Sequence, residues 1–156
     1  MAKRAAHTLK RRFETIDLAI TCWLGEHGLK ILQVSLAIVF IWFGLLKTFW
    51  MSPANDLVIR TVYWVDPSWF VPFLGWWEVV IGLCLLYRPL IRIALFLMAV
   101  QMVGTFLPLI LLTQITWGSM PFTLTLEGQY IIKNIVLIGA AMVIGSHVRD
   151  KKCPIF

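Results

Sequence analysis

The sequence predicts an all-α integral membrane protein, folded as a four-helix bundle that runs up-down-up-down through the bilayer. Composition is the first observation behind this fold class. The chain has 156 residues, of which 60% are hydrophobic and 14% charged, with a mean hydropathy of +0.82. A soluble domain is usually about half apolar and about a quarter charged. A soluble fold is therefore excluded.

Four long apolar stretches are the second observation. They cover residues 29–50, 70–87, 90–113 and 127–147, and each has the roughly 17–25 residues that a helix needs to cross a bilayer. Only helices satisfy their own backbone hydrogen bonds at this length in lipid. Arg88 and Pro89 separate the second and third stretches by a tight break. We expect a surface segment at 1–28, a membrane domain at 29–147 and a tail at 148–156.

The basic residues give an orientation. Eleven of the fourteen lie before or just inside the first span, at the 88–92 turn or in the tail: Lys3, Arg4, Lys10, Arg11, Arg12, Lys30, Arg88, Arg92, Arg149, Lys151 and Lys152. By the positive-inside rule, both termini are cytoplasmic and the loops at 51–69 and 114–126 face the other side. The net charge of +6 is explained by topology and by anionic lipid headgroups, and no nucleic-acid partner is expected.

Two further helices are predicted outside the spans. Leu9, Phe13, Ile16, Ile20 and Trp23 recur at helical spacing against a basic face, which is typical of an amphipathic helix on the cytoplasmic surface. We expect it to end near Gly25 or Gly28. In the first outer loop, Ser52 and Pro53 suggest a helix start and Pro67 a stop. A short interfacial helix there would cover the outer mouth of the bundle.

Polar residues within the spans are the candidate site. A charge deep in a bilayer costs roughly 2.5–3.5 kcal/mol, so such side chains face the bundle interior and need partners. Helical spacing places them in the outer half of one bundle. We expect a buried cluster centred on Glu78 and Lys133. Its other members are Lys47, Gln101, Thr105, Glu127, Gln129 and Asn134.

Two interpretations of this cluster stay open. The polar side chains could only neutralise one another and hold the helices in register. They could also form a pocket for the polar head of a hydrophobic molecule such as a quinone, with its carbonyls accepting from Lys133, Gln129 or Gln101. In that pocket Trp76, Trp77 or Phe106 would flank the ring. Breaking one partner of a buried ion pair is costly, whereas replacing both by apolar groups is often neutral, which favours the functional interpretation.

Several chemistries have no support in the sequence. Cys22, Cys84 and Cys153 form no CxxC motif, and all three are expected near the cytoplasmic side, where disulfides are disfavoured. His27 and His147 lie near span ends without carboxylate spacing, so no metal site is expected. The sequence contains no phosphate-binding loop and no nucleophile elbow. No cofactor is evident, apart from a bound quinone or lipid.

A family resemblance is carried by four segments, namely LAIVFIWFGLLK, SPANDLV, GWWEVVIGLCLL and EGQYIIKNIVLIGAAMVIG. They resemble the DoxX-like superfamily of small four-span membrane proteins, above all an inner-membrane branch linked to reactive-chlorine resistance. The resemblance covers residues 29–147. Gly44 with Lys47, Glu78, and Lys133 with Asn134 match the family pattern. It implies a four-helix membrane bundle associated with redox or oxidative-stress systems, since some relatives are membrane subunits of thiosulfate:quinone oxidoreductases.

These observations lead to three functional hypotheses. The first is a bacterial-type inner-membrane protein that binds a quinone-like or amphiphilic molecule in the outer-half pocket and serves a redox or stress complex. It is not expected to catalyse a reaction alone. The second is a non-catalytic accessory or structural subunit of a larger membrane complex. The third is a small proton or solute transporter. Membrane lipids and a protein partner, or a second copy of the chain, are the expected partners.

Overall fold

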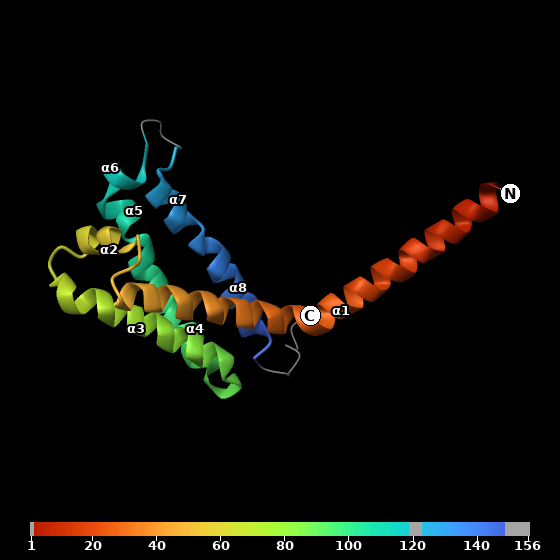
Figure 1. Ribbon diagram of the computed structural model, residues 1–156, viewed down its shortest axis with the longest axis horizontal. Coiled ribbons are helices and arrows are strands. Elements are labelled where there is room, and N and C mark those ends of the chain that lie inside the picture. Colours follow the sequence, from red (N-terminus) through yellow and green to blue (C-terminus); the bar gives the residue numbers. More distant parts are fainter. Residues whose placement is uncertain (1, 119–122, 149–156) are drawn as a thin grey trace, which may run out of the picture. The chain divides into compact units, whose positions relative to one another are not determined.

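The computed structural model describes residues 2–118 and 123–148, with side chains from residue 11 onward, and this part of the chain is helical (Figure 1). Its elements run in the order α1 (Ala2–Thr48), α2 (Asn55–Thr61), α3 (Pro67–Leu86), η1 (Arg88–Leu90), α4 (Ile91–Phe106), α5 (Pro108–Leu111), α6 (Thr113–Thr116), α7 (Leu126–Ile132) and α8 (Asn134–Ser146). Within these residues, extended pairing is limited to one isolated bridge between Trp117 and Leu124. Beyond Val148, the expected tail, with its basic residues and Cys153, lies outside the described residues.

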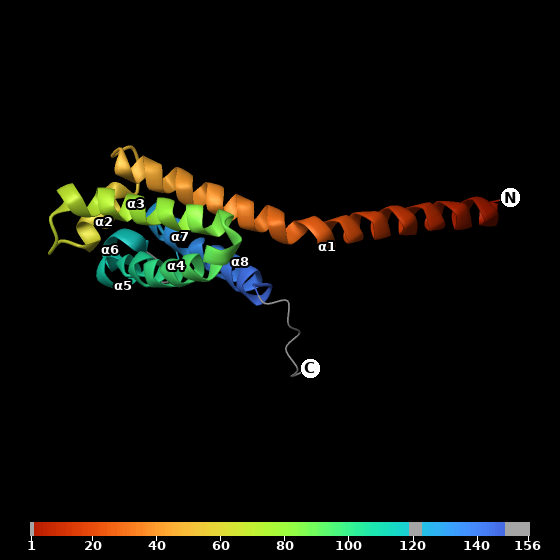
Figure 2. The ribbon, with the colours of Figure 1, turned by 90° about the horizontal axis from the view of Figure 1, so that it is seen from below.

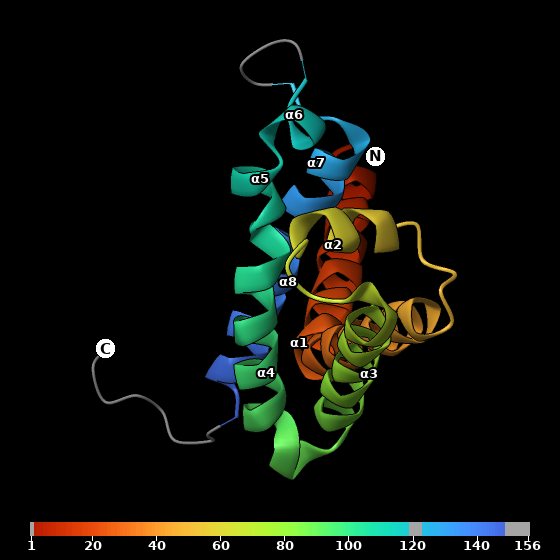
Figure 3. The same ribbon diagram turned by 90° about the vertical axis from the view of Figure 1, so that its left-hand side faces the viewer.

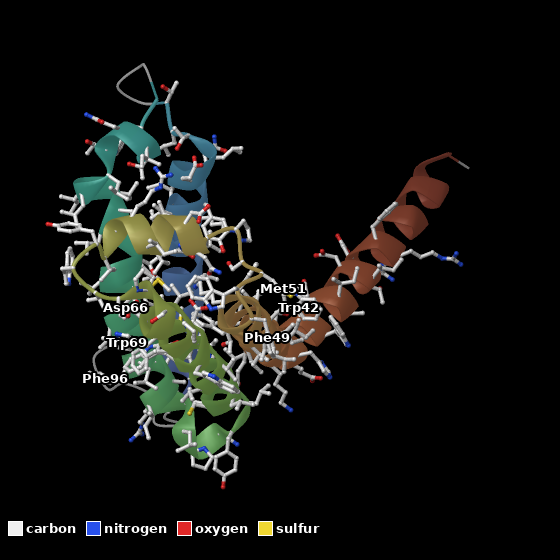
Figure 4. The ribbon with its side chains drawn as sticks, turned by 60° about the vertical axis from the view of Figure 1, so that its left-hand side comes forward. Trp42, Phe49, Met51, Asp66, Trp69 and Phe96 are labelled. Atoms are coloured by element: carbon white, nitrogen blue, oxygen red, sulfur yellow. The ribbon has the colours of Figure 1, made fainter. Side chains whose placement is uncertain are left out.

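Within the described residues, four helical segments are long and apolar enough to cross a membrane, so the architecture is that of a multi-pass membrane protein. They are Arg11–Thr48, Pro67–Leu86, Arg88–Leu111 and Leu126–Ser146. The last three match the predicted spans to within a few residues. Large apolar side chains on these segments are exposed, among them Trp42 at 64% and Phe96 at 67% (Figure 4). Lipid, not a protein core, is the expected environment of such side chains.

The first span differs from the prediction. We expected a surface helix ending near Gly25 or Gly28, but α1 continues without interruption from Ala2 to Thr48. Neither glycine adopts a positive φ angle, and the first proline of the chain is Pro53. Glycine inside a helix costs only about 1 kcal/mol relative to alanine, so it weakens a helix without ending it.

The chain separates into two compact units, Met1–Leu32 and Gln33–Phe156. In the first unit, apolar side chains such as Phe13, Ile16 and Trp23 are exposed. In the second unit, the remainder of α1 packs with the helices that follow it. Its buried apolar core is formed by Leu36, Ala37, Phe40, Val71, Val79, Ile81, Leu85, Ile91, Ala94, Met98, Met102, Ile131 and Ile144.

Short connections position the helices of this second unit. The single turn η1 joins α3 to α4, which lie side by side (Figure 3). Pro67 was expected to stop a helix, but it is the first residue of α3, and the Asp66 carboxylate caps that helix by accepting from the Ser68 N–H at 2.9 Å. Proline suits a first helical position because its missing N–H has no intrahelical partner there. The preceding helix α2 ends earlier, at Thr61.

The third and fourth spans are both interrupted. Pro108 lacks a backbone N–H, and α4 ends at Phe106 before α5 resumes at Pro108. In the fourth span α7 ends at Ile132 and α8 begins at Asn134, although no proline is present. Figure 2 shows these elements from below. Interruptions at membrane depth are tolerated where the freed backbone groups find partners or line a cavity, and both lie beside the candidate site.

Candidate functional site

A buried polar cluster joins three helices of the second unit. Lys47 from α1 and Gln101 from α4 both donate to the same oxygen, Oε1 of Glu78 in α3. The three residues are 8%, 9% and 5% exposed, respectively. We call these residues the polar triad. Its ammonium and carboxylate neutralise each other, which removes most of the cost of placing either charge in a low-dielectric interior.

Glycine contacts explain why the triad forms. Gly44 and Gly75 precede Lys47 and Glu78 by three residues, and an added Cβ on Gly44 would lie 2.5 Å from the Gly75 carbonyl oxygen. A Cβ on Gly75 would lie 2.6 Å from the Gly44 carbonyl oxygen. Small residues let membrane helices approach until their backbones touch. The side chains one turn further along each helix are therefore held at bonding distance.

The same contact recurs further along α3. A Cβ on Gly82 would lie 2.8 Å from the Ala37 carbonyl oxygen. Gly44, Gly75 and Gly82 thus define a glycine seam between α1 and α3. Beyond Gly82, at the end of the seam that the basic residues predict to be cytoplasmic, Gln33 of α1 donates to the Leu85 carbonyl oxygen of α3. Backbone packing and two polar links together fix the register of these two helices.

Two hydrogen-bond acceptors of the polar triad have no partner among the described residues. The second carboxylate oxygen of Glu78, Oε2, is buried without a hydrogen-bond partner among the described residues. The same is true of the amide oxygen of Gln101, Oε1. Buried polar atoms are paired in more than about nine cases of ten, so two free oxygens on adjoining side chains are unusual.

A cavity of about 420 Å³ lies against the polar triad. Lys47, Glu78 and Gln101 form part of its wall, and Thr105, Tyr130, Lys133 and Asn134 complete the polar lining. Its apolar lining comes from Val39, Phe40, Phe43, Met102, Val136 and Leu137. Lys133 and Val136 are themselves exposed, so the cavity reaches the surface of the unit at α8. We call it the polar cavity.

A second cavity of about 290 Å³ adjoins the first. The two share Lys47, Gln101, Thr105 and Tyr130 in their walls. The second cavity is also lined by Thr61. Its remaining lining residues are apolar residues, glycine or proline, namely Ala54, Leu57, Val58, Val62, Phe70, Phe73, Leu74, Trp77, Val100, Gly104, Pro108 and Ile131. We call it the apolar cavity. Helix α2, predicted as a short helix over the bundle mouth, supplies part of this wall.

Lys133 does not hold the central position that we predicted for it. The ion-pair partner of Glu78 is Lys47, whereas Lys133 is exposed and lines the polar cavity from its far side. Its ammonium lies 3.6 Å from the ring centroid of Tyr130 and 5.8 Å from that of Phe43. Cation–π contacts of this kind stabilise a lysine without an anion. No glycine brings α7 or α8 to backbone contact with α3, which is why this lysine stays apart.

The other predicted site residues divide into two groups. Thr105 lines both cavities and donates to the Gln101 carbonyl oxygen at 3.0 Å. Buried Asn134 lines the polar cavity and donates to the Tyr130 carbonyl oxygen at 3.3 Å. Trp77 lines the apolar cavity. The residues that line neither cavity are Trp76, Phe106, Glu127 and Gln129, of which Phe106 is half-buried and the other three are exposed.

Tyr130 is the site residue that the sequence reasoning missed. It borders both cavities and carries the ammonium of Lys133 on its ring. A signal was available, because Tyr130 precedes Lys133 by three residues and Asn134 by four, and such residues share a helix face. Among the described residues there is no group of three or more histidine, cysteine, aspartate or glutamate side chains that could hold a metal ion.

Comparisons of the chain with protein-family models, with curated proteins and with solved structures found no match.

Proposed function

We propose that this membrane protein binds an amphiphilic, quinone-like molecule across its two adjoining cavities. The observation that carries the proposal is the division of one continuous lining into a polar and an apolar part. The polar triad, Lys133 and Asn134 border one cavity, whereas the other is bordered, beyond the wall that the two share and Thr61, by apolar side chains, glycine and proline. A molecule with a polar ring and an apolar tail matches this division.

The dimensions of the site suit such a molecule. Ligand sites in proteins are typically clefts of about 300–1,000 Å³, mostly apolar, with a few placed polar groups. The polar cavity of about 420 Å³ accommodates a substituted six-membered ring. The apolar cavity of about 290 Å³ accommodates the first part of a hydrocarbon tail beside Phe70, Phe73 and Trp77.

Hydrogen-bond donors on two sides of the polar cavity support recognition of an oxygen-bearing ring. Lysine carries three N–H donors, of which Lys47 uses one on Glu78. Lys133 also lines this cavity, with its ammonium over the Tyr130 ring. A ring that carries oxygens at opposite positions can accept a hydrogen bond from Lys47 at one oxygen and from Lys133 at the other. In this arrangement Trp77 contacts the tail, because it borders the apolar cavity and not the polar one.

The role in the cell follows from the sequence resemblance to the DoxX-like superfamily. We propose that the protein resides in a bacterial-type inner membrane and serves a redox or oxidative-stress complex, delivering or holding the amphiphile for a partner protein. The chain contributes the binding site, and the partner contributes the redox centre. An accessory subunit without a ligand is the alternative, and the binding experiment below separates the two.

We also propose an up-down-up-down path with both termini in the cytoplasm and α2 at the outer interface. The distribution of basic residues supports this orientation. It is tested with single cysteines in an otherwise cysteine-free chain and a membrane-impermeant maleimide. Tyr63→Cys, at a position that is 80% exposed, should react from outside intact cells. The natural Cys22, also exposed, should react only after permeabilisation. The reverse result would invert the orientation.

Native mass spectrometry of gently extracted protein tests the binding proposal. The wild-type protein should carry a small lipophilic molecule. Thr105→Phe should lose it, because this position lines both cavities and the larger side chain fills their common wall. The matched control is Ala99→Phe, which adds a phenyl group to an exposed position of α4 that lines neither cavity. An empty wild-type protein held in a stable complex would instead support the accessory-subunit function.

A further inference from the structure

The two unpartnered oxygens of the polar triad share one chemical property, because both are hydrogen-bond acceptors. Oε2 of Glu78 belongs to the carboxylate that pairs with Lys47. The orientation of the Gln101 amide is fixed by its bond to the same carboxylate. A carboxylate oxygen cannot donate, so the amide must present its nitrogen to Glu78. The amide oxygen is then left without a partner.

The donors in the cavity wall do not satisfy these two oxygens. The Thr105 hydroxyl donates to the Gln101 backbone carbonyl at 3.0 Å. The Asn134 amide donates to the Tyr130 carbonyl at 3.3 Å. The Lys133 ammonium lies over the Tyr130 ring on the far side. Unsatisfied acceptors are costly to bury, so the site favours any ligand that brings a donor to them.

We infer that the polar cavity recognises a hydroxyl group, and that it therefore binds the reduced, quinol form of a quinone-like molecule in preference to the oxidised quinone. This inference rests on the proposed binding function. A hydroxyl both donates and accepts, so a quinol hydroxyl donates to one of the two free oxygens, that of Glu78 or that of Gln101, while accepting from Lys47 or Lys133. A quinone carbonyl only accepts, and it leaves both free oxygens unpaired.

Side-chain torsions bring the free oxygens within reach of a ligand. Both residues line the polar cavity, although the two atoms themselves are buried. The terminal torsions of glutamate and glutamine are broad and soft, unlike the staggered torsions nearer the backbone. A rotation of the terminal groups would turn Oε2 of Glu78 and Oε1 of Gln101 toward the cavity, and it would exchange the hydrogen bond between Gln101 and Glu78 for bonds to the ligand.

Binding of two matched probes tests the inference. Decyl-benzohydroquinone and decyl-benzoquinone have the same carbon skeleton and the same tail, and differ in that the first carries two hydroxyl groups where the second carries two carbonyl groups. Their dissociation constants are measured by native mass spectrometry under anaerobic conditions with the full-length protein in detergent. We expect the hydroquinone to bind at least about tenfold more tightly, because a site built around hydrogen bonds rejects an analogue that cannot make them. Equal binding, or tighter binding of the quinone, would overturn the inference.

Variants assign the preference to the two oxygens. Gln101→Met removes one acceptor and keeps the Lys47–Glu78 pair, so the preference for the hydroquinone should fall several-fold. Glu78→Gln replaces an acceptor by an amide that can donate, and the preference should vanish or reverse. Gln129→Met is the control, because Gln129 lines neither cavity and donates to the Leu124 carbonyl at 3.1 Å. An unchanged preference in Gln101→Met and Glu78→Gln would overturn the assignment.

The outcomes separate this inference from the proposed function on which it rests. If neither probe binds the wild-type protein, the proposed binding function fails, and the inference fails with it. If both probes bind equally, the binding function stands and only the hydroxyl preference fails. A third probe, monodecanoylglycerol, distinguishes the source of the hydroxyl. Binding as tight as that of the hydroquinone would support recognition of a lipid hydroxyl, and much weaker binding would show that the aromatic ring contributes.

Discussion

Two sets of polar residues lie at the membrane-spanning helices of this protein, and they are stabilised in different ways. Lys47, Glu78 and Gln101 are buried and bonded to one another across three helices. The fourth span carries Gln129 and Lys133, which are exposed. Gln129 donates to the Leu124 carbonyl, and the Lys133 ammonium lies over the rings of Tyr130 and, more distantly, Phe43 of α1. The residue types are similar, but their environments are not.

The difference follows from the spacing between helix backbones. Between α1 and α3 the glycine seam lets the two backbones come into contact, and at this spacing the long side chain of Lys47 reaches Glu78. In α8, an added Cβ on Gly139 would find no heavy atom within 4 Å. Glycine in a membrane helix is therefore informative only where it faces another backbone. A polar residue near such a contact gains a partner on the neighbouring helix, as Lys47 and Glu78 do.

The largest effect is expected from breaking the ion pair. Lys47→Met leaves the carboxylate of Glu78 buried without its cation, and we expect the free energy of unfolding to fall by about 3–5 kcal/mol. Lys133→Met removes the same charge from an exposed position, and its effect should stay within about 0.5 kcal/mol. Both values are measured by unfolding in mixed micelles, followed by tryptophan fluorescence. Equal losses in the two variants would mean that the two lysines share the carboxylate, contrary to the geometry.

A smaller effect, of opposite sign at two positions, is expected from alanine in place of glycine. Gly75→Ala places a methyl group 2.6 Å from the Gly44 carbonyl oxygen, and overpacking of this kind costs typically about 1–3 kcal/mol. Gly139→Ala meets open space, so the better helix propensity of alanine should stabilise the protein by about 0.5–1 kcal/mol. Thermal unfolding of the two purified variants gives the comparison. A stabilised Gly75→Ala variant would refute the seam.

The smallest effect concerns a carboxylate outside the membrane. The hydrogen bond from the Ser68 N–H lowers the pKa of the Asp66 carboxyl below its ordinary value of 3.8. Asp66 is labelled at the start of α3 in Figure 4. Because the pKa is lowered in the folded state, the stabilisation is present above the ordinary value and is lost as the pH falls through the folded value.

Asp66→Asn tests this cap separately from the buried carboxylate. Asparagine caps a helix about as well as aspartate but does not titrate. The melting temperature of the wild type should therefore fall relative to that of the variant as the pH is lowered from about 6 to about 3. A difference that is constant over this range would show that the Asp66 carboxylate has no role in pH-dependent stability.

Much of the helical architecture could be predicted from sequence, because a bilayer imposes a minimum length on an apolar helix. The positions of three spans follow from this requirement, as does the tight turn at Arg88. The continuity of α1 through Gly25 and Gly28 could not be predicted, since both glycines are compatible with either a helix or a break. The interruption at Lys133 could not be predicted either, because no proline marks it in the sequence.

The sequence indicated which residues form the candidate site better than it indicated which of them pair with one another. Helical spacing placed Lys47, Glu78 and Gln101 in one buried cluster, and these residues meet in the structure. Spacing along one helix does not say which neighbouring helix comes closest, so Lys133 was placed wrongly beside Glu78. Tyr130 was missed because an aromatic residue in a membrane helix is usually explained by lipid contact.

The glycine seam also limits how this protein can change by mutation. In most cores a residue that grows can be accommodated by a neighbour that shrinks. At Gly44 and Gly75 the obstacle is the carbonyl oxygen of the facing backbone, which every amino acid carries. No second substitution on the opposite helix can restore the space. Each glycine is thus fixed independently of its neighbours, and variation in this bundle must occur elsewhere, on the lipid-facing surface and in the cavity walls.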